Sequence, residues 1–199
     1  MNMHEYQKVK NYNYSEYCDY LQEKYGIGLC DYMRPSWTKN TKVTRTKEGL
    51  YAHHKYEDHA IMLSHPEYAK NNPYEWQLKE NIVYCDLLEH LFLHILICEN
   101  PSVNKNENEA VGVGGVVNHI VPELNDVYSG FVAKQAWQLN CHTAVINDKD
   151  VYLELIMRFK YSNENDPLML RQLYSSKGAE HGVWSEENNL ELYREIAQL

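Results

Sequence analysis

The sequence predicts an α+β fold that is mainly helical, with a small unit of two strands and a helix embedded between helical regions. Three observations lead to this prediction. Residues 87–97 are apolar and contain no Gly or Pro, and two short segments before them are rich in β-branched and aromatic residues. Segments near both ends of the chain repeat apolar residues at helical spacing. We therefore divide the chain into residues 1–44, 45–100 and 101–199.

The N-terminal region, residues 1–44, is predicted to be helical and to lead into a basic arm. Tyr17, Tyr20 and Leu21 fall on one face of a helix over 15–24, and Gly26 follows as a stop signal. Residues 37–47 then alternate Lys and Arg with Thr and contain no acid. This pattern is typical of an arm that contacts phosphate groups, and equally of a solvated loop.

The middle region, residues 45–100, contains the predicted strands and the apolar helix. Residues 49–54 form the first strand, which ends in His53 and His54. Asn81 opens the second strand, over 81–86, and Asp86 is placed to cap the N-terminus of the following helix. The sequence therefore predicts a strand-to-helix unit with a pair of histidines beside it.

The apolar helix carries His90 and His94 four residues apart, so both imidazoles leave the same face about one turn from each other. Two such imidazoles can bind one cation. Most of the neighbouring residues are apolar, so unpaired imidazoles would be unfavourable at this position, and metal binding would satisfy them. A single histidine on an apolar helix is more often a core residue, and Asn81 alone is more often a turn residue.

The combination resembles the ββα-metal finger of HNH endonucleases, the His-Me finger family, over residues 45–98. The likeness rests on the His-His pair, an Asn that opens the second strand, and a His-x-x-x-His helix. It implies that His53, His90 and His94 bind one divalent metal ion. It also implies that His54 is the general base that deprotonates water and that Asn81 orients the loop bearing His54.

Phosphodiester hydrolysis gives each of these residue types a separate task. A divalent cation stabilises the negative charge that develops at the phosphate and the leaving oxygen, while a neutral histidine activates water near pH 7. A shell made only of imidazoles leaves the full charge of the metal for the phosphate. It admits Zn²⁺, Mn²⁺ or Ni²⁺ as well as Mg²⁺, so the sequence leaves the identity of the metal open.

Four polar residues lie in the segment between the strands, and a fifth precedes His90. We predict that Glu57, Asp58, His59 and His65 are solvated loop residues rather than ligands. Glu89 is interpreted as a surface helix residue, with the orientation of a ligand imidazole as the alternative.

The C-terminal region, residues 101–199, is predicted to be helical and carries no recognisable catalytic motif. A polar stretch over 100–108 marks a loop. The glycine-rich run over 111–117 completes no nucleotide-binding fingerprint. Residues 151–160 and 188–198 show the apolar spacing of amphipathic helices. This region is assigned to target binding, dimerisation or contact with a partner protein.

Composition narrows the class of protein. The net charge of −9 argues against broad nonspecific binding of nucleic acid, and no stretch is apolar enough to span a membrane. The N-terminus lacks the apolar segment of a secretory signal, which predicts a cytoplasmic protein. The five cysteines show no Cys-x-x-Cys pairing and are expected to be reduced thiols.

These observations together predict a metal-dependent HNH-type endonuclease that hydrolyses phosphodiester bonds in DNA and is encoded by a phage or a mobile element. The expected partner is DNA, with a homodimer left open. Two alternatives come from other classes. One is a nuclease-like protein that acts by binding another protein, as an inhibitor in conflict between phage and host, and the other is an RNase.

Overall fold

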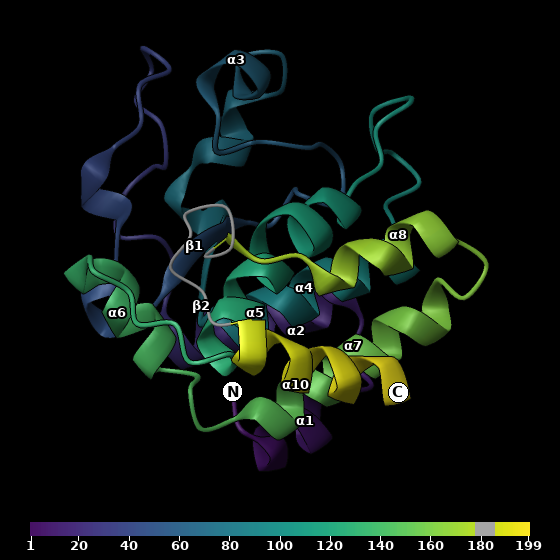
Figure 1. The fold of residues 1–199 in the computed structure, drawn as a ribbon. Helices are drawn as coiled ribbons and strands as arrows, with labels where there is room; N and C mark the ends of the chain where they lie inside the picture. The colour runs from purple at the N-terminus through teal and green to yellow at the C-terminus, as the bar shows by residue number, and fades with distance from the viewer. Residues whose placement is uncertain (178–185) are drawn as a thin grey trace.

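The structure is a computed structural model, and it describes residues 1–177 and 186–199. A two-stranded antiparallel sheet is surrounded by helices, as Figure 1 shows. The elements are α1 (Met3–Val9), α2 (Tyr14–Tyr25), β1 (Tyr51–His54), α3 (Pro66–Ala69), β2 (Ile82–Cys85), α4 (Leu87–Glu99), a π-helical turn (Gly115–Ile120) that continues into α5 (Val121–Tyr128), α6 (Ala136–Thr143), α7 (Lys149–Ser162), α8 (Pro167–Arg171) and α10 (Glu186–Gln198). The predicted fold class is confirmed.

The sheet and α4 form the predicted unit of two strands and a helix. β1 pairs with β2 so that His53 lies opposite Val83 and His54 opposite Ile82. Asp86 caps α4, because its side chain accepts a hydrogen bond from the backbone of Glu89. Glu89 returns a hydrogen bond to the backbone of Asp86, which completes a capping box and fixes the direction in which α4 leaves the sheet.

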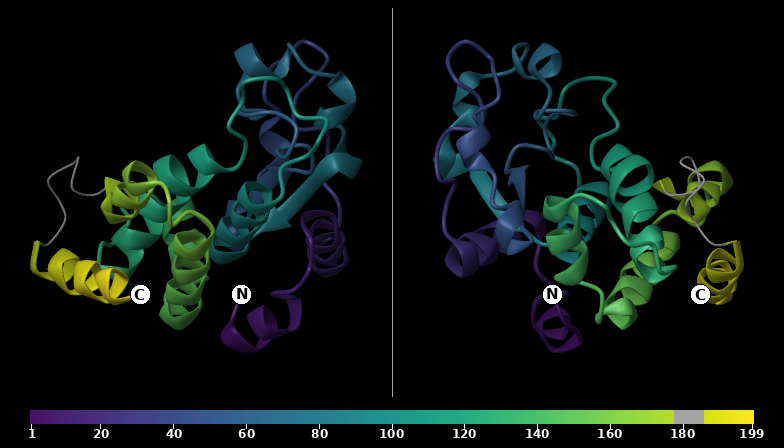
Figure 2. Two further views of the ribbon diagram at one scale, coloured as in Figure 1. Left: turned by 90° about the vertical axis from the view of Figure 1, so that its right-hand side faces the viewer. Right: turned by 60° about the vertical axis from the view of Figure 1, so that its left-hand side comes forward.

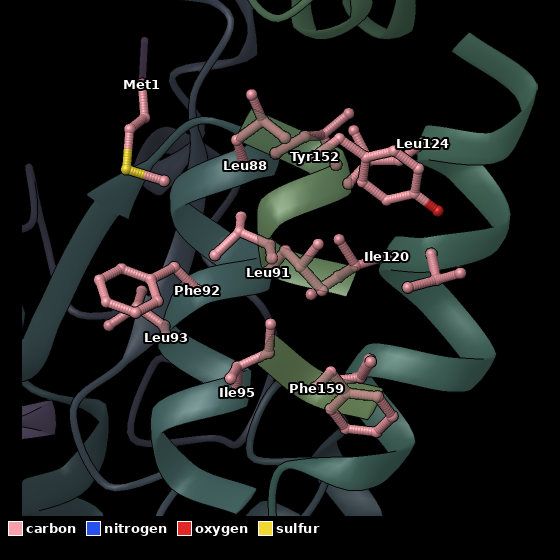
Figure 3. Close-up of a cluster of buried hydrophobic side chains, with 14 of the residues drawn as sticks. Met1, Leu88, Leu91, Phe92, Leu93, Ile95, Ile120, Leu124, Tyr152 and Phe159 are labelled. Carbon is pink, nitrogen blue, oxygen red and sulfur yellow. The ribbon is translucent and has the colours of Figure 1, made fainter. Parts of the chain in front are cut away.

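The α4 helix is the centre of the hydrophobic core. Ten of its thirteen residues are buried. Leu91 and Ile95 lie toward α5 and α7, where they meet Ile120 and Phe159, as Figure 3 shows. Each of the three sequence regions contributes residues to this one cluster, from Tyr6 near the N-terminus to Ile196 in α10. Because α4 is held from several sides, its histidines have little freedom to move.

The loops around the sheet gather at one end of the molecule. Residues 26–50 and 55–81, with α3 among them, lie at the end opposite to α1, as Figures 1 and 2 show. The predicted helices over 15–24, 151–160 and 188–198 are present as α2, α7 and α10. Gly26 ends α2 with a φ of 82°, a conformation that glycine adopts without steric cost.

Three further expectations can be compared with the structure. Glu89 is wholly buried, so its interpretation as a surface residue is wrong. Its carboxylate is stabilised in the interior by the capping box and by the Lys24 ammonium, which lies 2.7 Å away. The basic segment forms two 3-10 turns, Thr41–Val43 and Thr46–Glu48, and no regular strand. In the described part of the chain, no helix has the length and apolar character needed to cross a membrane.

Candidate metal centre

Four side chains converge where β1 packs against α4. β1 contributes His53, α4 contributes His90 and His94, and the turn that follows β1 contributes Glu57. One possible ligand atom from each residue lies within 4.8 Å of those from the other three. The structure therefore brings together all three histidines predicted to bind metal, and it adds a carboxylate. These four side chains, which we call the metal centre, could hold one metal ion.

Glu57 corrects the sequence analysis, which placed it among solvated loop residues. The chain turns back after β1, because the backbone N–H of Glu57 donates to the carbonyl of His54 at 3.1 Å. This turn directs the Glu57 carboxylate toward His53, four residues earlier, and leaves the side chain only 17% exposed. The candidate donor set is therefore three imidazoles and one carboxylate, where the sequence analysis expected imidazoles alone. The four-residue spacing from His53 to Glu57 was the available signal.

A tyrosine from α2 fixes the protonation of the His53 ring. The Tyr14 hydroxyl lies 2.8 Å from Nε2 of His53 and also donates to the carbonyl of His54 at 3.2 Å. A hydroxyl has only one hydrogen to donate, so when it goes to the carbonyl of His54 the hydrogen between Tyr14 and His53 comes from Nε2 of His53. Nδ1 of His53 then carries a lone pair. It is buried and has no hydrogen-bond partner.

A backbone carbonyl determines which ring nitrogen of His94 carries the hydrogen. Nδ1 of His94 lies 3.1 Å from the carbonyl oxygen of Gly112. A carbonyl can only accept, so Nδ1 carries the hydrogen and Nε2 carries the lone pair. That Nε2 atom faces the metal centre, 3.2 Å from Nε2 of His90 and 3.3 Å from Oε2 of Glu57.

The arrangement leaves Oε2 of Glu57 facing atoms that cannot donate to it. Nδ1 of His53 lies at 3.4 Å and Nε2 of His94 at 3.3 Å, and each presents a lone pair. Two lone pairs directed at a carboxylate oxygen repel it, whereas a cation among them attracts all three. Ligand atoms bound tetrahedrally to one ion at about 2.05 Å are separated by about 3.3 Å. The two separations from Oε2 of Glu57 match this value, and all four ligand atoms lie within 4.8 Å of one another.

The protonation states of the ligands also suit a cation. The pKa of His53 is lowered to about 3, because burial, with the neighbouring His94 and His54, outweighs Glu57, which raises it. Burial, with His94 and His53, holds the pKa of His90 well below its usual range. For Glu57, burial alone would raise the pKa, but the charge of His53 and hydrogen bonds from His54 and His94, when these rings are protonated, hold the pKa well below the usual value. Neutral imidazoles and an ionised carboxylate are the forms that bind metal.

The glycine-rich run over 111–117 packs against His94 of the metal centre. Gly115 lies directly against the imidazole of His94, so that a Cβ added at this position would overlap Nδ1 and Cε1 of the ring. At Gly114 the nearest atom to an added Cβ is 3.7 Å away, in Asn118. The imidazole of His94 therefore leaves no room for a side chain at position 115, whereas position 114 has room for one. The glycine-rich run thus allows the backbone to pack closely on His94. No local sequence pattern indicates this role.

The ring of His90 is supported from the side by Tyr51. The two rings are stacked, with centroids 6.0 Å apart and planes 29° apart. The Tyr51 hydroxyl donates to Oε1 of Glu123 in α5 at 2.8 Å. His142 and Lys177 also bind the Glu123 carboxylate, at 3.1 Å and 2.9 Å. We call Tyr51, Glu123, His142 and Lys177 the Glu123 cluster.

The predicted base, His54, is buried beside the metal centre. Its Nδ1 lies 3.2 Å from Oε1 of Glu57, and its Nε2 lies 3.2 Å from Oε1 of Gln77. The amide of Gln77 donates to the carbonyl of Leu63, which fixes its oxygen toward His54. Both ring nitrogens of His54 thus face oxygen acceptors. The ring of Tyr32 covers the imidazole at a centroid distance of 4.3 Å.

Asn81 lies immediately before β2 and forms hydrogen bonds with two neighbouring segments. Its backbone carbonyl accepts from the N–H of Lys55, directly after His54, at 2.9 Å. Its side-chain amide donates to the carbonyl of Glu75 at 2.7 Å. Asn81 therefore ties the end of β1 to the segment that carries Gln77.

The remaining polar residues of the segment between the strands lie outside the metal centre. His59 binds Asp58, and its other ring nitrogen lies 3.1 Å from the hydroxyl of Ser102. His65 is exposed beside Tyr68.

Comparison with protein-family models, with curated proteins and with solved structures found no match.

Proposed function

We propose that the chain is a metal-dependent endonuclease that hydrolyses phosphodiester bonds in DNA. One observation carries the proposal. Lone pairs from β1 and α4 converge on an ionised carboxylate, on a unit of two strands and a helix, next to a further histidine. Such a set of donors suits a divalent first-row metal such as Zn²⁺, Mn²⁺ or Ni²⁺ better than Mg²⁺, which prefers oxygen ligands.

The open side of the metal centre indicates where substrate would approach. His53 is wholly buried and His94 is 6% exposed, whereas His90 and Glu57 are only partly buried. When bound, the ion would polarise the phosphate and stabilise the leaving oxygen. The four side chains would hold it at the solvent edge of the core, where a phosphate group can reach it.

His54 is proposed to take the proton from the attacking water. In this conformation its Nε2 contacts Gln77, so the role requires that a water molecule replaces the Gln77 oxygen beside the ring. Glu57 links the two functions, because one of its oxygens faces the metal-binding atoms and the other lies next to His54. A change at Glu57 would therefore affect both metal binding and the position of His54.

The basic segment supports DNA as the substrate. Lys39, Lys42 and Lys47 are exposed and free to meet phosphates. The ammonium of Lys39 lies 4.7 Å above the ring of Tyr32, which in turn covers His54. Positive charge thus stands close to the proposed base although the whole chain is acidic.

Four protein ligands are also the number found in closed structural zinc sites. The experiment must therefore separate a metal that takes part in hydrolysis from one that only stabilises the fold. Metal-free protein is reloaded with Zn²⁺, Mn²⁺, Ni²⁺ or Mg²⁺, and cleavage of plasmid DNA, single-stranded DNA and tRNA is compared with the melting temperature of each sample.

We expect the reloaded wild-type protein to cut DNA and His94→Ala to lose both metal and cleavage. His54→Ala should keep its metal and lose about 10²–10⁴-fold in rate through loss of the base. His65→Ala, a histidine that is exposed and remote from the metal centre, is the matched control and should behave as wild type. A metal that raises the melting temperature without cleavage of any substrate would show a structural site. Cleavage of tRNA alone would show an RNase.

A further inference from the structure

One helical face runs along the open side of the metal centre. Gly115, His119 and Glu123 follow one another at four-residue spacing through the π-helical turn and into α5, which places them on the same side of the helix. Gly115 lies against the ring of His94, and Glu123 binds the hydroxyl of Tyr51, whose ring is stacked on His90. His119 lies between these two contacts along the chain. The spacing therefore places it on the same helical face as both.

His119 differs from the four ligands in being exposed to solvent. Partial burial lowers its pKa, Lys177 and His94 lower it further, and Glu57 and Glu123 raise it, while His119 in turn lowers the pKa of His90. A histidine with a free ring thus stands beside the open edge of the metal centre, where the buried His54 cannot reach without a rearrangement.

We infer that His119 is a further catalytic residue, which donates a hydrogen bond from its ring N–H to a non-bridging oxygen of the scissile phosphate. This inference rests on the proposed function for the identity of the substrate. The donor adds to the attraction of the cation for the phosphate. The C-terminal region, which carries no recognisable motif, would then supply part of the active site.

The test uses the full chain loaded with Zn²⁺ and compares wild type with His119→Ala, His119→Asn and Asn118→Ala. Asn118 is the exposed neighbour of His119 and serves as the matched control. Metal affinity is measured by competition with a chromogenic chelator. Binding of dimethyl phosphate, a diester without bases, is measured by titration calorimetry, and single-turnover cleavage of plasmid DNA gives the rate.

We expect His119→Ala to keep its metal affinity, to bind dimethyl phosphate about 10–100-fold more weakly, and to cut DNA about 10–100-fold more slowly, as loss of a hydrogen bond to a charged group predicts. His119→Asn, which retains an N–H donor, should recover part of both losses. Asn118→Ala should match wild type.

Three results would overturn the inference. Unchanged binding of dimethyl phosphate in His119→Ala would exclude the contact. Loss of metal in that variant would make His119 a ligand instead, and an Asn variant no better than the Ala variant would exclude a donor role. Failure of the proposed function is a separate outcome, because a wild-type protein that cuts no nucleic acid would still show the dependence of phosphate binding on His119.

Discussion

Two neighbouring clusters of histidine and glutamate differ in one property, the supply of hydrogen-bond donors. In the Glu123 cluster, Tyr51, His142 and Lys177 all present donors to the carboxylate, so both oxygens are satisfied. In the metal centre, one oxygen of Glu57 faces lone pairs of two histidines instead. The same residue types thus form a closed ion-pair network in one place and a site that could hold a cation in the other.

The comparison shows that composition and burial do not identify a metal site. Both carboxylates are largely buried, and in each case neighbouring groups lower the pKa. What separates them is the orientation of the rings, which is imposed from outside: Tyr14 and the carbonyl of Gly112 hold the protons of His53 and His94 away from Glu57.

The largest expected effect comes from a substitution that displaces the His94 ring by steric overlap. Gly115→Ala places a methyl group against the ring of His94 and must displace it, so we expect metal affinity to fall by about 100-fold. Gly114→Ala changes the adjacent glycine in the same run, where there is room for the methyl group, and should leave the affinity unchanged. Competition with a chelator measures both. Equal affinities for the two variants would show that the ring can shift without loss.

A smaller effect tests the Glu123 cluster through pH. Burial alone would raise the pKa of Glu123, but His142, Lys177 and Tyr51 lower it to about 2. Because this value lies below the ordinary 4.5, the ionised form contributes stability above pH 4.5, and that stability is lost as the pH falls through 2.

Glu123→Gln should therefore be less stable than wild type by about 2 kcal/mol at pH 7, and the difference should shrink as the pH falls from 4.5 toward 2. Urea unfolding of the two proteins across this pH range measures it. The variant should keep the same metal-dependent rise in melting temperature that we expect of wild type. Loss of that rise would mean that the two clusters are not separate.

The smallest effect removes a single hydroxyl. Tyr14→Phe keeps the ring of α2 in place but frees Nε2 of His53, so that either nitrogen can carry the proton. We expect about a tenfold loss of metal affinity with little change in fold. Tyr20→Phe is the matched control, since that hydroxyl lies in the same helix and donates to Glu5, away from the site. If the two variants bind metal equally well, Tyr14 does not set the protonation of His53.

The sequence was informative where a local pattern defines the structure. The apolar helix with His90 and His94, the capping Asp86 and the two strands follow from spacing and propensity, and α2 follows from its periodicity and the stop at Gly26. These elements form in the predicted places because neighbouring residues along the chain determine them.

The parts of the site that were missed depend on contacts between distant segments. Glu57 becomes a candidate ligand only because a turn returns the chain toward His53. Tyr14 lies about forty residues before its partner, and Gly112 lies eighteen residues after His94. Nothing in their local sequence marks them, since the packing of α2 and of the glycine-rich run on the β1–α4 unit is a property of the whole core.

The position of Gly112 and Gly115 has a consequence for the chain during its synthesis. A nascent polypeptide that has emerged only as far as α4 already holds every ligand, yet it lacks the carbonyl and the close backbone that set the His94 imidazole. If the metal centre holds an ion, tight binding therefore requires that translation has delivered the segment that contains Gly112 and Gly115.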